Sequence, residues 1–150
     1  MNSINDLYRQ VIMEHYKSPR NKGLKEDEGY VNLRLKNPSC GDDVTIQAKI
    51  ENDLIKSIRH EGSGCSICCS SASVMSEVLK NKTVREAEAI INDYYSLIKG
   101  EEVQDEDSLD EAIAYRGVAN FPARVKCATL AWRALGAILQ GQKGEQDVEE

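Results

Sequence analysis

The sequence predicts an α+β fold in which helices pack on a small three-stranded antiparallel sheet. Apolar residues alternate with polar ones in three short runs between residues 31 and 61. Apolar residues recur at helical spacing before and after those runs, and the turn pair Asn52-Asp53 separates two of them. A length of 150 residues with 41% apolar content suits one core. We therefore expect a single domain over residues 1–150, with residues 1–3 and 141–150 flexible.

The first helix is expected over residues 4–17, where Leu7, Val11 and Ile12 form one apolar face and Pro19 follows the end. Three strands are expected next, and they cover residues 31–35, 44–50 and 54–61. Short connections between successive runs favour an antiparallel meander.

The second half of the chain reads as helical. A helix is predicted from Ser66 to about residue 79, and Thr83 with Glu86 forms a capping box for a helix that stops at Gly100. A short helix is expected to begin at Ser108, after an acidic loop. The last helix should begin at Pro122, because proline suits the first helical position.

Charge and hydropathy exclude several classes of function. The chain has 19 Lys and Arg against 25 Asp and Glu, a net charge of -6, which argues against a nucleic-acid partner. Its longest apolar run, Leu135–Leu139, is too short to cross a membrane. No basic stretch followed by an apolar block stands near Met1, so we expect no secretory signal and a cytoplasmic location.

The chain has five cysteines, an odd number, which makes a disulfide framework a poor interpretation in a reducing compartment. Cys40 and Asp42 flank Gly41 between two predicted strands, so both side chains could reach one ion. Cys65 precedes a predicted helix, whose free N–H groups favour a thiolate. Cys127 lies inside the last helix, one turn after Arg124.

Three thiolates and one carboxylate would fill a tetrahedral Zn²⁺ site. They would leave two uncompensated negative charges, which a cation such as Arg124 could offset. Spacing alone, however, leaves open that these cysteines are buried small side chains. Cys68, Cys69, His15 and His60 are expected to be packing or surface residues rather than ligands.

Several motifs together resemble the IscU/NifU-like iron–sulfur assembly family over residues 5–140. An early helix with Leu7-Tyr8, Val11-Ile12 and His15-Tyr16, followed by Pro19-Arg20-Asn21, fits that family. The other motifs are Asn37-Pro38-Ser39-Cys40-Gly41-Asp42, Gly62-Ser63-Gly64-Cys65-Ser66-Ile67, Ser71-Ala72-Ser73-Val74-Met75 and Phe121-Pro122-Ala123-Arg124-Val125-Lys126-Cys127. Scaffold members carry His before the third cysteine and a Leu-Pro-Pro-Val-Lys chaperone motif before that pair. Here Lys126 replaces the His, and the stretch from Phe121 differs. With the extra segment over residues 101–120, these departures make the chain similar to the SufU branch, the zinc-dependent sulfurtransferases of Gram-positive SUF systems.

The resemblance implies zinc ligands at Cys40, Asp42, Cys65 and Cys127, with Cys40 as the residue that accepts sulfur and Arg124 beside it. It implies an enzyme that takes persulfide sulfur from a SufS-type cysteine desulfurase and passes it to the downstream SUF scaffold complex. One alternative is an iron–sulfur scaffold, which would hold a transient cluster on the same cysteines. A second alternative is a non-enzymatic module in which zinc is purely structural.

Overall fold

The structure, a computed structural model, describes residues 3–38 and 41–147. Five helical segments and three strands follow the expected order within the described residues, with one further strand at the end. The helices are α1 (Ser3–Lys17), α2 (Ser66–Leu79), α3 (Val84–Lys99), the 3₁₀ segment η1 (Glu106–Asn120) and α4 (Pro122–Leu139). The strands are β1 (Tyr30–Asn37), β2 (Asp42–Glu51), β3 (Leu54–Ser63) and β4 (Gly144–Asp147).

The sheet differs from the three-stranded antiparallel sheet predicted above. Its strand order is β3-β2-β1-β4; the first three strands are antiparallel, but β4 pairs parallel to β1. The prediction of three strands was therefore wrong by one, because four polar residues at 144–147 carry no alternating apolar pattern. The predicted turn at Asn52-Asp53 is confirmed, since both residues have positive φ (51° and 66°), as a tight hairpin between β2 and β3 requires.

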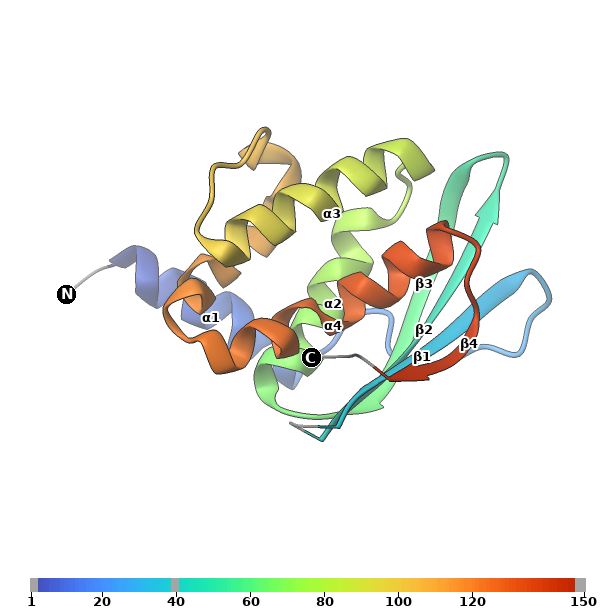
Figure 1. Ribbon diagram of the computed structural model, residues 1–150, viewed down its shortest axis with the longest axis horizontal. Coiled ribbons are helices and arrows are strands. Elements are labelled where there is room, and N and C mark those ends of the chain that lie inside the picture. Colours follow the sequence, from blue (N-terminus) through green and yellow to red (C-terminus); the bar gives the residue numbers. More distant parts are fainter. Residues whose placement is uncertain (1–2, 39–40, 148–150) are drawn as a thin grey trace.

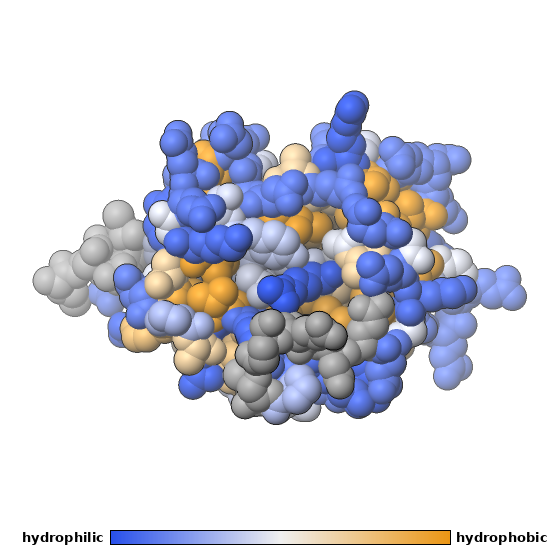
Figure 2. All heavy atoms as spheres, in the orientation of Figure 1, coloured by the Kyte–Doolittle hydropathy of each residue, from blue (hydrophilic) through white to orange (hydrophobic). Residues whose placement is uncertain are grey.

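Helices cover one face of the sheet, with α4 over β1 and β2 and with α2 beside β3 (Figure 1). The inward residues of the strands alternate with exposed ones, as in β2, where Val44, Ile46 and Ala48 are buried. In Figure 2 apolar side chains show between the helices, with charged side chains around them. The core lies between the sheet and the helices α2 and α4, and it continues among α2, α3, η1 and α4.

An aromatic cluster joins the helices. Tyr94 of α3 stacks on Trp132 of α4 with ring centroids 3.8 Å apart, and Tyr115 of η1 meets Tyr94 edge-on. Ser71 of α2 accepts a hydrogen bond from Trp132 Nε1 (3.0 Å) and donates one to the carbonyl of Ala128 (2.6 Å). These contacts fix α4 against α2, the two helices that carry cysteines toward the site.

Two helix starts test the capping predictions. The box at Thr83 is confirmed, because Glu86 N–H donates to Thr83 Oγ1 and Thr83 N–H donates to Glu86. The expected start at Ser108 was displaced: η1 begins at Glu106, and the side chain of Asp105 accepts from Ser108 N–H. Among the described residues, no helix is both long and apolar enough to cross a membrane.

Candidate metal centre

Asp42 begins β2, opposite Asn37 of β1, at the point where the two strands separate into a turn. Its side chain is buried, and Oδ1 accepts a hydrogen bond from Cys65 N–H (3.1 Å). Its second oxygen, Oδ2, is buried with no hydrogen-bond partner among the described residues. An unpartnered buried carboxylate oxygen is costly, so this atom is placed to bind something that the protein itself does not supply.

Cys65 is the N-cap residue of α2, with extended backbone angles (φ -71°, ψ 168°) and no capping hydrogen bond from its own side chain. The Cys65 thiol therefore makes no capping hydrogen bond to the helix, and it lies at the positive end of the helix dipole. Gly64 brings the chain here: a Cβ on Gly64 would lie 2.4 Å from Asp42 Oδ1, so only glycine allows this approach.

Cys127 lies on α4, almost fully buried at 1% exposure. Burial first, then the neighbouring Asp42 carboxylate and Cys65 thiol, raises the pKa of the Cys127 thiol above its ordinary value. A thiol in these surroundings holds its proton until a cation replaces that proton.

The side chains of Asp42, Cys65 and Cys127 meet although they come from β2, α2 and α4. One ligand atom from each lies within 4.8 Å of the other two. Zinc binds sulfur at about 2.3 Å and carboxylate oxygen at about 2.0–2.2 Å, so three ligand atoms grouped this closely are near enough for one zinc ion to contact all of them. The described residues supply two sulfurs and one oxygen, which leaves one tetrahedral position for a fourth ligand.

Arg124 lies exposed one turn before Cys127, as the sequence predicts. The Cys127 sulfur, which accepts from its guanidinium, and the nearby Cys65 raise the pKa of Arg124 above its ordinary value. A cation therefore stands beside both sulfurs. Cys40, the fourth expected ligand, falls outside the described residues; Gly41, with φ 75°, joins it to Asp42.

Of the described cysteines and histidines, Cys68, Cys69, His15 and His60 are not part of the cluster. Cys68 is buried at 2% exposure, and burial raises the pKa of its thiol. The half-buried thiol of Cys69 donates to the carbonyl of Gly64 (3.7 Å). Beside it a cavity of about 220 Å³ opens between α2, the end of β3 and the segment after α1.

His15 and His60 are buried and hydrogen-bonded. His15 contacts Ser73 Oγ (2.8 Å) and Glu111 Oε1 (2.9 Å), which ties α1 to α2 and η1. His60 Nε2 donates to the carbonyl of Arg20 (2.7 Å). Both serve packing, as expected. The hydrogen bond from Cys65 N–H to Asp42 was missed by sequence reasoning, and the Gly62-Ser63-Gly64 stretch was the signal that could have indicated it.

The chain resembles known proteins over most of its length. Residues 7–135 match the family model of the NifU-like N-terminal domain. The chain is 42% identical over 133 residues to the zinc-dependent sulfurtransferase SufU of Bacillus subtilis strain 168, covering 89% of each. It is 33% identical over 150 residues to the iron–sulfur cluster assembly scaffold protein IscU of Streptococcus pyogenes serotype M1, covering 100% of this chain and 93% of that one.

Solved structures show the same fold. A protein from Fervidobacterium islandicum AW-1, assigned as an iron–sulfur cluster assembly scaffold for the SUF system, superposes with a TM-score of 0.78 at 34% identity, covering 87% of this chain and 94% of that chain. A crystal structure of a hypothetical protein gives a TM-score of 0.83 at 36% identity, covering 91% and 98%. By its sequence and its fold, the chain belongs to the NifU-like N-terminal domain family.

Proposed function

We propose that this protein is a zinc-dependent sulfurtransferase that accepts persulfide sulfur from a cysteine desulfurase and passes it to the SUF iron–sulfur assembly machinery. The observation that carries the proposal is the convergence of Asp42, Cys65 and Cys127, with one carboxylate oxygen buried and unpartnered. The 42% identity to a zinc-dependent sulfurtransferase supports the choice of metal.

The donor set suits zinc. Asp42, Cys65 and Cys127, with Cys40 as the fourth ligand, would hold the ion through sulfur and oxygen donors of the kind that zinc prefers. Bound zinc would keep the thiols deprotonated at neutral pH without redox chemistry of its own. Such a site carries excess negative charge. The guanidinium of Arg124 lies beside the two sulfurs and offsets part of that charge.

The residues divide the work of sulfur transfer. Asp42, Cys65 and Cys127 hold the site, and Cys40 is the acceptor. Its thiolate attacks the outer sulfur of the desulfurase persulfide, so a new S–S bond forms at Cys40 while the old one breaks and the desulfurase regains its thiolate. Docking makes the transfer effectively intramolecular. Arg124 is a positioning residue that orients the Cys40 thiolate. A SufS-type desulfurase, a SUF scaffold as final recipient and a cytoplasmic location belong to this proposal.

The test is desulfurase turnover with and without the protein, with zinc content measured on the same sample. Cys40→Ala should abolish acceleration while the circular dichroism spectrum stays native, and Asp42→Ala should lower zinc content. Cys68→Ala is a matched control that removes a thiol outside the cluster. Full acceleration by Cys40→Ala would remove Cys40 from the mechanism. A protein that holds no zinc, and whose stability and activity ignore added zinc, would contradict the metal assignment.

An iron–sulfur scaffold is the second candidate, because several relatives are described as IscU scaffold proteins. It would use the same cysteines to hold a transient cluster. The two functions separate after anaerobic reconstitution with iron and sulfide. A coloured, oxygen-labile protein that passes its cluster to an acceptor would favour the scaffold, whereas a colourless zinc protein that accelerates the desulfurase favours the transferase.

A further inference from the structure

Strand β4 covers the outer edge of β1 with a short piece of the chain's own C-terminal segment. It pairs parallel with residues Leu33–Lys36 and follows α4 after a brief connection (Figure 1). Tyr30, Val31 and Asn32 of β1 lie beyond its reach, and no described strand pairs with their outer edge. Four residues of pairing make a weak cover for an edge strand.

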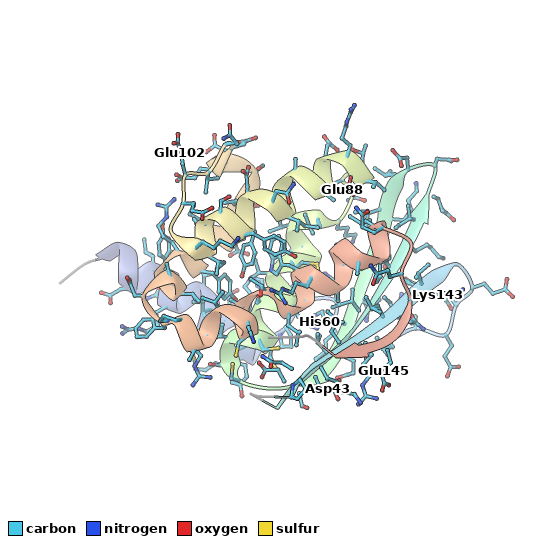
Figure 3. All side chains as sticks on the ribbon, in the orientation of Figure 1. Asp43, His60, Glu88, Glu102, Lys143 and Glu145 are labelled. Atoms are coloured by element: carbon cyan, nitrogen blue, oxygen red, sulfur yellow. The ribbon has the colours of Figure 1, made fainter. Side chains whose placement is uncertain are left out.

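Ion pairs at the surface fasten this cover. Glu145 contacts Arg34 (3.2 Å) and Lys36 (3.0 Å), and Arg34 in turn binds Asp43 on β2 through two hydrogen bonds. The Glu145 side chain is 55% exposed, and Arg34 and Lys36 are 42% and 36% exposed. Figure 3 shows Glu145 and Asp43 near the same end of the sheet. Solvent weakens ion pairs that are this exposed. The two cations therefore favour a carboxylate at position 145, but they add little to the stability of β4 pairing.

We propose that the β1 edge is a docking edge for an extended acidic segment of a partner protein, and that β4 is its displaceable cover. The cover itself shows what the edge accepts: a parallel backbone with a carboxylate between Arg34 and Lys36. A longer partner segment gains further pairs along residues 30–32, which the chain's own tail leaves open. Strand addition of this kind derives its affinity from main-chain hydrogen bonds and its selectivity from side chains.

The location links such docking to the metal centre. β1 ends at Asn37, which pairs with the ligand residue Asp42 across the turn. A partner strand that extends along β1 to Asn37 would therefore end one strand away from Asp42. The proposal is independent of sulfur transfer, since binding at this edge is measured without desulfurase.

The test uses the full chain and a fluorescent peptide with the sequence of residues 142–150 as the probe. Glu145→Lys reverses the charge that faces Arg34 and Lys36, and should open the edge. Glu102→Lys makes the same change in net charge on the connection between α3 and η1, far from β4 (Figure 3). Fluorescence anisotropy should show about tenfold tighter binding to Glu145→Lys than to the wild type or to the control, because the competing cover is removed.

Hydrogen exchange supplies the second readout. Amides 33–36 should exchange faster in Glu145→Lys and slow again when the peptide is added. Equal peptide affinity for all three proteins, or unchanged exchange at 33–36, overturns the proposal. Light scattering checks for dimers: if Glu145→Lys dimerises by exchanging its own tail, a second copy is the occupant and the partner-protein proposal is overturned.

Discussion

Gly64→Ala tests whether the close approach of Gly64, the residue after β3, to Asp42 builds the metal centre. The new Cβ would lie 2.4 Å from Asp42 Oδ1 and 3.3 Å from its Cα. Heavy atoms essentially never approach a Cβ closer than 3.0 Å, so Oδ1 has to move by at least about 0.6 Å. Oδ1 is also the acceptor of the hydrogen bond from Cys65 N–H, so the displacement disturbs that bond.

Such overpacking costs about 1–3 kcal/mol, and zinc ligands tolerate displacements of only about 0.2 Å. Since the strain falls on a ligand, zinc affinity should drop by about 5- to 150-fold, which a competition titration with a chromophoric chelator measures. Gly117→Ala is the matched control, because a Cβ there meets nothing within 4 Å. If Gly64→Ala binds zinc as tightly as Gly117→Ala, Asp42 does not hold the metal in the arrangement described.

Three further changes probe the scaffold through chemical unfolding followed by circular dichroism. Burial lowers the pKa of His60, so the unfolded chain binds more protons below about pH 6.5. The free energy of unfolding should therefore fall as the pH drops from 7 toward 5, and less so in His60→Gln; equal slopes would contradict this. Ser71→Ala leaves the buried Trp132 N–H without its acceptor and should cost about 1–3 kcal/mol, whereas a neutral result would mean that water replaces the hydroxyl. Thr83→Ala removes the cap of α3 and should cost about 1 kcal/mol, with no effect on zinc content.

The sequence predicted helix ends and turns correctly where they depend on residues close together in the chain. The Thr83 capping box, the αL stop at Gly100 (φ 78°) and the Asn52-Asp53 turn depend on neighbours in the chain, and the structure confirms each. The predicted start of η1 was wrong because Asp105, not Ser108, is the N-cap residue. The side chain of Asp105 accepts the hydrogen bond from Ser108 N–H. Strand β4 escaped prediction because its partners, Arg34 and Lys36, lie more than 100 residues earlier.

The metal centre could likewise be predicted only in part from the sequence. Spacing could not bring Asp42, Cys65 and Cys127 together, because only the packing of α2 and α4 against the sheet makes them neighbours. Resemblance named these positions, and the structure adds the unpartnered Asp42 oxygen as an independent reason to expect a cation. The placement of Cys40 remains a prediction.

The single tryptophan of the chain makes the molecule its own optical reporter. Trp132 is fully buried, stacks on Tyr94 and lies on the same helix as Cys127, five residues further along. Its emission should shift to the red when α4 leaves α2, and it should also respond when a cation draws Cys127 toward Cys65. Cation binding at the metal centre and separation of α4 from α2 can thus be followed in real time through Trp132 fluorescence, without an attached dye.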